Sequence, residues 1–224
     1  MFAPWVLYKE DFQDIGGHDS GFAPFPYEDS DIFQRWILAG YELIQSRDAF
    51  VYHLTCRGHR WSEQIGKYDN YFKLASEKAA KHYIRKLGSW IKNDEHQYPI
   101  IIPKYDIGLI VKNCNSNLLE ILEPWCSNIY IEDEMEVIKS HYIDKEQNNT
   151  EYILNYKIRP YDNEKQNEIL VRIDATSFDK SDFQIIQQLP EIIKDNGEIG
   201  SFQLGNLFID IIHMNEYQNT LIKN

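Results

Sequence analysis

Apolar residues recur at helical spacing in two stretches of the N-terminal half. Over Asp31–Ala39 the apolar positions fall three to four residues apart, which predicts a helix that Ser30 caps and Gly40 ends. Residues 69–92 show the same period and predict a long helix. Between them, Glu42–His53 has the composition of one or two short strands. The residues before the first helix are rich in Gly and Pro and predict a loop.

The C-terminal half alternates short apolar runs with helical patterns. The runs predict strands at 106–112, 128–131 and 168–175 and a hairpin formed by 199–204 and 207–212, and the helical patterns predict helices at 117–123, 133–146 and 181–194. A strand, a helix and a second strand with short connections predict a βαβ unit. The fold class expected from this order of elements is therefore α/β, or α+β.

Charge is distributed unevenly along the 224 residues. The whole chain carries a net charge of −12, of which residues 1–103 hold −2 and residues 104–224 hold −10. The change falls in a polar stretch that ends in proline, so we expect a domain boundary at about 95–104, with domains over 1–98 and 104–224. The acidic balance argues against a nucleic-acid partner, because affinity for the phosphate backbone comes from Lys and Arg clusters.

Nothing in the apolar pattern indicates a membrane or secreted protein. No apolar run approaches the roughly 18 residues that a membrane span needs. The first residues lack the basic and then apolar regions of a signal peptide. The three cysteines, Cys56, Cys114 and Cys126, are too few and odd in number for a disulfide framework. We therefore expect a cytoplasmic location, with Cys114 and Cys126 packing as small apolar residues.

Three carboxylates, Glu28, Asp29 and Asp31, stand within four residues at the predicted start of the first helix. Two explanations stay open. Acidic side chains in a first turn offset the positive end of the helix dipole. A carboxylate at a junction of loop and helix is also well placed to act as a general base toward a substrate hydroxyl.

A second group of polar residues follows His53. His53, Cys56 and His59 lie three residues apart, which is a spacing that metal ligands can have. A structural zinc site takes four ligands, however, and no second Cys/His pair lies nearby. A packing role for His53 is one interpretation. The other is that it helps hold a metal-bound diphosphate, because Arg57 and Arg60 offer forked donors to phosphate oxygens.

Basic residues also line the long predicted helix. They are Lys78, Lys81, Arg85, Lys86 and Lys92. A charge run on a helix is usually its solvated face, although such a run also attracts anionic substrates or membrane surfaces. The pattern therefore favours a solvated face.

Several motifs of the first 61 residues occur in a defined order. They are Ala3-Pro4-Trp5, Lys9-Glu10-Asp11-Phe12, Gly16-Gly17-His18-Asp19, Phe22, Phe25, Glu28-Asp29-Ser30-Asp31, Arg35, Gly40-Tyr41 and His53. This set resembles the acceptor half of a family 2 glycosyltransferase with the GT-A fold, in which a GG-F-D-E-x-F stretch precedes an E-D-x-D-L-x-x-R helix, G-Y, a short strand and a His. The family's GG-F-D is changed here to Gly17-His18-Asp19.

The resemblance implies roles for residues at the acidic turn. Asp29 matches the family's catalytic base, which deprotonates the acceptor hydroxyl, and Glu28 supports or shares that role. Asp31 falls among the substrate-binding residues. Trp5 is placed where an aromatic platform for a sugar ring is useful, and it is also a plausible core residue.

The resemblance also implies a metal-assisted reaction. His53 matches the family's His that helps bind a divalent cation, Mn²⁺ or Mg²⁺. Arg57 and Arg60 then flank the leaving diphosphate and stabilise the charge that develops on it.

The donor-binding half of such enzymes has no counterpart in this sequence. That half is a Rossmann-like unit of about a hundred residues, and it carries a D-x-D motif after an apolar strand. We therefore expect a C-terminal part of an enzyme, truncated or encoded as a split gene, which needs a separate donor-binding chain and binds the cation only in the complete enzyme. Segments of residues 104–224 are similar to C-terminal regions of glycosyltransferase-like proteins of large marine phages, which implies an accessory α+β domain.

The resulting hypothesis is an inverting glycosyltransferase that moves a sugar from a nucleotide-sugar donor to a hydroxyl acceptor. The alternative is a non-catalytic module that binds glycans or docks a separate donor-binding chain. A glycosidase is disfavoured because the three acidic residues are close neighbours, whereas glycosidases need carboxylates on opposite sides of the scissile bond.

Overall fold

The computed structural model describes residues 5–46, 48–49, 61–62, 67–68, 70–132, 136–150, 153–162 and 167–217. The chain divides into two compact units. The first unit comprises Met1–Tyr83, Ile91–Ile101 and Thr220–Asn224, and the second comprises Ile84–Trp90 and Ile102–Asn219. The domain boundary expected at about 95–104 stays a prediction.

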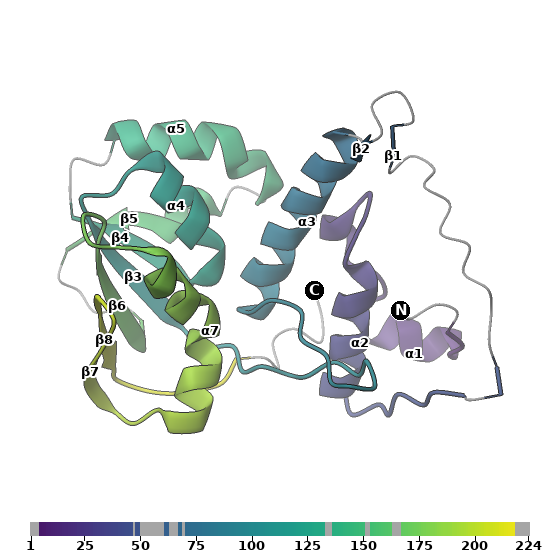
Figure 1. Ribbon diagram of the computed structural model, residues 1–224. Coiled ribbons are helices and arrows are strands. Elements are labelled where there is room, and N and C mark those ends of the chain that lie inside the picture. The colour runs from purple at the N-terminus through teal and green to yellow at the C-terminus, as the bar shows by residue number, and fades with distance from the viewer. Residues whose placement is uncertain are drawn as a thin grey trace. The chain divides into compact units, whose positions relative to one another are not determined.

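The second unit is built on a six-stranded sheet with the order β5-β4-β3-β6-β8-β7. The strands are β3 (Ile107–Lys112), β4 (Asn128–Ile131), β5 (Ile158–Pro160), β6 (Ile169–Asp174), β7 (Gly200–Leu204) and β8 (Leu207–Ile211). The first four in that order run parallel, and β8 is antiparallel to both β6 and β7. The fold is therefore mixed α/β, which confirms the predicted class (Figure 1).

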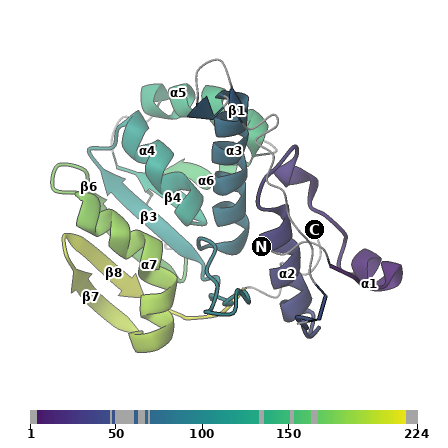
Figure 2. The same cartoon turned by 45° about the vertical axis from the view of Figure 1, so that its right-hand side comes forward.

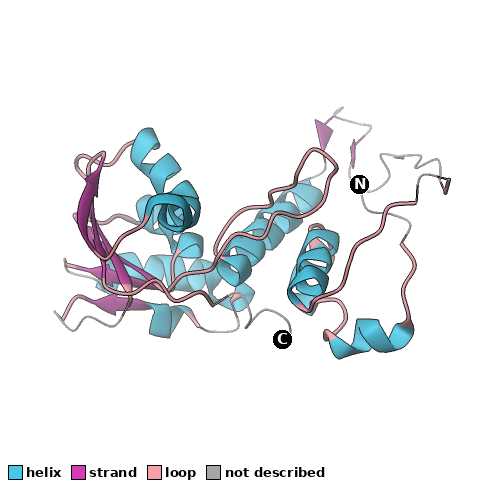
Figure 3. Cartoon of the chain, turned by 90° about the horizontal axis from the view of Figure 1, so that it is seen from below, coloured by secondary structure: helices cyan, strands magenta, loops and turns pink. Residues whose placement is uncertain are grey.

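Helices connect these strands and cover one face of the sheet. They are α4 (Ser116–Leu122), α5 (Glu136–Glu146), α6 (Leu154–Lys157) and α7 (Lys180–Asn196), with the 3-10 turns η3 (Glu123–Trp125) and η4 (Gln147–Asn149). Two of the helix starts are set by polar caps: the Asn115 side chain accepts from the Leu118 amide, and Asp179 and Asp182 form a capping box. Figure 2 shows α4 and α7 lying over the strands, and Figure 3 shows the sheet with its helices to one side.

The core of this unit follows from the two-residue period of the strands. Leu109 and Val111 of β3 point into the main core with their counterparts on β4, β6 and β8 and with apolar residues of α4 and α7. Ile110, between them, points to the other face and joins a small cluster with Tyr130 and Leu170. The parallel strands are therefore buried on both faces, as their nearly continuous apolar sequences predict.

The first unit is mainly helical. It contains α1 (Lys9–Asp14), η1 (Ser20–Phe22), α2 (Glu28–Leu38), the two-residue antiparallel pair β1 (Trp61–Ser62) and β2 (Lys67–Tyr68), and residues 70–83 of α3 (Asn70–Leu87). The apolar side of α2 packs its residues Ile32, Phe33 and Trp36 against Ile15. Gln34 of the same helix donates a hydrogen bond to the buried hydroxyl of Tyr83 in α3. The amphipathic pattern of α2 thus organises this unit.

Some predicted boundaries differ from the observed ones. Helix α2 starts at Glu28 rather than at Asp31. Helix α3 ends at Leu87 rather than at residue 92, because the next residue, Gly88, takes a left-handed φ of +75°. The predicted end of α2 is confirmed, because Gly40 has a φ of +87° and the Tyr41 amide donates to the Trp36 carbonyl. The prediction of strands over 42–53 is wrong for residues 42–46 and 48–49, because they form a loop. The rest of that range lies outside the described residues.

Arg35 of α2 is fully buried and ties the helix to the preceding turn. Its guanidinium pairs with the equally buried carboxylate of Asp31 at 2.9 Å and donates to the carbonyls of Ile15 at 2.6 Å and Gly17 at 2.5 Å. Every one of these acceptors would be costly to bury without a donor. Arg35 therefore fixes the path of the chain as it approaches α2.

Glu123 has the corresponding role in the second unit. Its buried carboxylate accepts from Arg85 at 2.7 Å, from Lys157 at 2.8 Å and from the Tyr142 hydroxyl at 2.9 Å, and Arg85 also contacts Glu146 at 2.9 Å. Burial alone raises the pKa of Glu123, but Lys157 and Arg85 outweigh it and lower that pKa to about 2. The solvated position predicted for Arg85 is wrong, since its side chain is only 7% exposed.

We expect Arg35→Met to lower the free energy of unfolding by about 3–5 kcal/mol, because it leaves Asp31 charged and buried without its cation. Urea unfolding followed by circular dichroism measures the loss. Lys73→Met is the matched control: Lys73 and Glu77 also lie four residues apart, but both are exposed, so the expected loss is below about 1 kcal/mol. Equal losses in the two variants would contradict the assignment.

We expect Glu123→Gln to lower the free energy of unfolding at pH 7 by about 3–5 kcal/mol, since Arg85 and Lys157 lose their buried partner. A carboxylate with a depressed pKa contributes stability above its unfolded value of 4.5, and this contribution is lost as the pH falls toward 2. Urea midpoints between pH 7 and pH 2 should therefore fall less steeply for the variant. Glu120→Gln, which affects an exposed pair with Lys145, is the control and should follow the parent curve.

Candidate functional site

The acidic turn, which we define as Glu28, Asp29 and Asp31, forms the first turn of α2. The residue that caps it is Tyr27, whose φ of +81° lies in the left-handed region, so Ser30 is not the cap that the sequence predicts. A non-glycine residue in this region carries backbone strain, and such residues are concentrated at functional sites. All three acids lie where the helix dipole favours negative charge.

The three carboxylates have different surroundings. Asp31 is fully buried and bound by Arg35, which gives it a structural role, and its predicted contact with substrate stays a prediction. Asp29 and Glu28 are half-buried. Oε2 of Glu28 is buried, and no residue in the described part of the chain donates a hydrogen bond to it. Asp29 and Glu28 are therefore the two acids of the turn whose side chains are partly exposed.

Asp19 of the predicted Gly-Gly-His-Asp motif is held by two contacts. It accepts from the Gly21 amide at 2.8 Å, and its Oδ2 lies 3.0 Å from Nε2 of His82. The His82 ring also meets Phe22 edge to face at 4.7 Å. A Cβ on Gly21 would lie 2.3 Å from Nε2 of His82, so this approach requires glycine. No sequence signal pointed to His82, because it is 63 residues from Asp19.

Trp5 packs in an aromatic group in the first unit. It is half-buried, and its ring centroid lies 5.3 Å from that of Trp36, 5.9 Å from that of His18 and 6.1 Å from that of Phe33. These edge-to-face contacts agree with the core role considered for Trp5. Its use as a platform for a sugar ring stays a prediction.

The remaining predicted site residues, His53, Arg57 and Arg60, lie outside the described residues. Their proposed contacts with a cation and a diphosphate stay predictions. Across the described ranges, no three His, Cys, Asp or Glu side chains come together in a way that could hold a metal ion.

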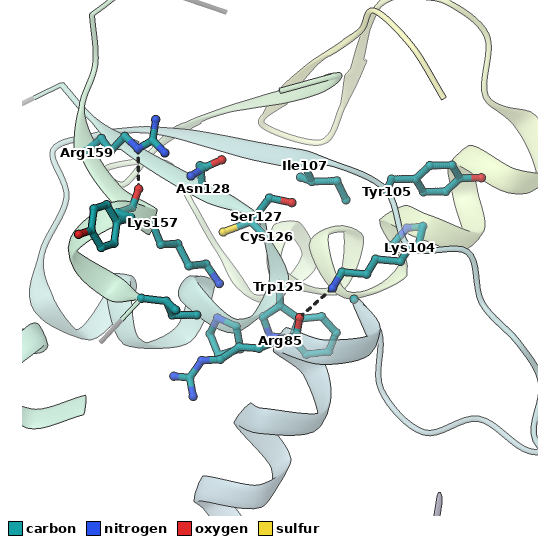
Figure 4. Close-up of a pocket in the computed structure, with 15 residues that line it drawn as sticks. Arg85, Lys104, Tyr105, Ile107, Trp125, Cys126, Ser127, Asn128, Lys157 and Arg159 are labelled. Carbon is teal, nitrogen blue, oxygen red and sulfur yellow. Dashed lines mark hydrogen bonds between the residues drawn. The ribbon is translucent and has the colours of Figure 1, made fainter. Parts of the chain in front are cut away.

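The second unit contains a pocket at the edge of the sheet where β3, β4 and β5 begin (Figure 4). Its volume is about 340 Å³, within the usual range for small-molecule sites. Four basic side chains line it: Arg85 of α3, Lys104 before β3, Lys157 of α6 and Arg159 of β5. We call it the basic pocket. Sequence reasoning missed it, since these residues are dispersed over the chain and only the sheet brings them together.

Comparison with known protein families matches part of the chain. A family model described as the N-terminal domain of galactosyltransferase matches residues 5–72, a segment that includes the acidic turn. No curated protein and no solved structure matches the chain. Within the described residues, no helix has the length and apolar character needed to cross a membrane. Residues 5–72 are therefore similar to a glycosyltransferase domain, which agrees at this coarse level with the predicted resemblance.

Proposed function

We propose that this protein takes part in the inverting transfer of a sugar from a nucleotide-sugar donor to a hydroxyl acceptor, with Asp29 as the general base. The observation that carries the proposal is the position of the acidic turn inside the segment that matches a galactosyltransferase domain. Assignment to the acceptor half of a family 2 enzyme with the GT-A fold is part of the same proposal.

The reaction requires the protein to position the acceptor and the donor and to remove a proton from the acceptor hydroxyl. The acceptor oxygen bonds to the anomeric carbon while the bond from that carbon to the diphosphate breaks, and the diphosphate leaves with the electron pair. Attack from the opposite side inverts the anomeric centre. The carboxylate of Asp29 takes the proton from the acceptor hydroxyl, which requires an ionised group within hydrogen-bond reach.

Glu28 supports this assignment. Its buried Oε2 lacks a donor within the described residues, and a buried acceptor of this kind is costly unless a ligand or water donates to it. In the proposal Glu28 supports or shares the role of Asp29, which removes the proton from the acceptor hydroxyl.

Asp31 and Arg35 contribute by holding the turn in place. Their ion pair is fully buried, and Arg35 also binds the carbonyls of Ile15 and Gly17. A general base that is fixed relative to its substrate gains rate, because less motion has to be restricted in the transition state. The role proposed for this pair is thus positional.

A divalent cation, Mn²⁺ or Mg²⁺, is part of the proposal as a group that stabilises the charge of the leaving diphosphate when it is bound. Its proposed ligand is His53, with Arg57 and Arg60 near the diphosphate, and all three lie outside the described residues. The steps above depend only on Asp29, Glu28 and the Asp31–Arg35 pair.

We expect Asp29→Asn to reduce sugar transfer by about 10²–10⁴-fold, the usual contribution of a general base. The measurement is nucleoside diphosphate release by the full-length protein from a panel of nucleotide sugars, with acceptor saccharides and Mn²⁺ or Mg²⁺ present. Asp14→Asn, at an exposed position of α1, is the matched control and should retain full activity. Near-normal turnover by Asp29→Asn would refute the base assignment.

The same assay separates the alternative of a non-catalytic module. Failure of every donor, together with saturable binding of acceptor saccharides, would favour a glycan-binding protein. Activity that returns only when a second protein supplies the donor site would support the proposed separate donor-binding chain. In that case Asp29→Asn should abolish the restored activity and leave the association of the two proteins unchanged.

A further inference from the structure

Lys104 places a positive charge in the basic pocket and is held there by the backbone. Its ammonium group donates to the carbonyls of Lys86 at 2.7 Å and Arg85 at 3.3 Å, at the end of α3. These bonds use two of its three donors. Burial, and then repulsion from Lys157 and Lys86, lowers the pKa of Lys104 to about 8. An anion in the pocket would relieve that repulsion.

Arg85 and Lys157 are fixed at the pocket by Glu123, and the carboxylates of Glu123 and Glu146 balance their two positive charges. Both side chains are only 7% exposed, and both bind the Glu123 carboxylate. Nη1 of Arg85 is buried and has no acceptor within the described part of the chain. Figure 4 shows Lys104 and Lys157 extending toward one another from opposite walls of the pocket. The pocket is therefore organised before any ligand enters.

The arrangement of the cations favours a phosphate over a carboxylate. Lys104 precedes β3, whereas Lys157 and Arg159 lie two residues apart where α6 meets β5, so cations reach the pocket from two separate parts of the chain instead of forming one flat fork. A phosphate monoester presents three oxygens in a tetrahedral arrangement and up to two charges, whereas a carboxylate presents two oxygens in a plane. The Cys126 thiol adds no competing negative charge, because burial raises its pKa to about 12.

The walls of the pocket suit an organic group attached to that phosphate. Tyr105 and Trp125 are buried at 6% and 8% exposure, and Tyr156 is 76% exposed. Aromatic side chains of this kind offer flat apolar surface beside the charged region. Ser127, and Asn128 at the start of β4, add polar groups to the lining of the pocket.

We propose that the basic pocket binds a small phosphorylated organic molecule, with its phosphate among Lys104, Lys157 and Arg159 and its organic part against Trp125 and Tyr156. The site belongs to the second unit, whereas the acidic turn belongs to the first. This inference does not depend on the proposed transfer of a sugar.

Isothermal titration of the full chain with phenyl phosphate, at pH 7 and constant ionic strength, tests the inference. We expect saturable binding that Lys104→Met weakens about tenfold or more, because a charge-assisted hydrogen bond is lost. Lys194→Met removes the same charge from an exposed position of α7 and should leave the affinity unchanged. Benzoate and inorganic phosphate should both bind more weakly than phenyl phosphate.

Each other result overturns part or all of the inference. Absence of saturable binding, or equal binding by Lys104→Met, would refute the site. Equal affinity for benzoate would refute the phosphate class, and equal affinity for inorganic phosphate would refute the role of the aromatic walls. If Lys104→Met fails to fold by circular dichroism, Lys104→Arg replaces it. That variant keeps the charge and should retain most of the affinity for phenyl phosphate. The affinities of benzoate and inorganic phosphate relative to phenyl phosphate still decide the chemical class of the ligand.

Discussion

The buried guanidinium of Arg35 is the interaction on which the first unit depends. It neutralises Asp31 and satisfies the carbonyls of Ile15 and Gly17, so four polar groups leave water together without an unpaired charge. Because these groups must be buried together, they constrain the path of the chain into α2 and require Asp31 and Arg35 in that helix. The acidic turn thereby contains one fully buried carboxylate that is committed to the fold and two partly exposed ones, Glu28 and Asp29.

In the second unit the central buried group is negative instead of positive. There a carboxylate, Glu123, gathers the cations Arg85 and Lys157 from separate helices. Removing one partner of such a group leaves an uncompensated charge in the interior, which makes the network costly to break even where its net contribution to stability is small. The network also brings Arg85 and Lys157 to the wall of the basic pocket.

The two units thus offer different chemistry. A half-buried acid such as Asp29 is suited to removing a proton from a hydroxyl, and the match of residues 5–72 to a galactosyltransferase domain gives that chemistry a context. The pocket lined by Lys104, Lys157 and Arg159 is suited to holding an anion in place.

The sequence alone determined the α/β class, every strand of the second unit except β5, and an acidic start for α2, because periodicity and charge near a helix start are local properties that neighbouring residues impose. It misplaced the cap of α2 and the exposure of Arg85, and it left His82 and the basic pocket unseen. Those features depend on contacts between residues far apart in the chain, such as Asp19 with His82 and Arg85 with Glu123. Only the tertiary structure decided them, since the energy of burying a charge depends on which partner the fold brings to it.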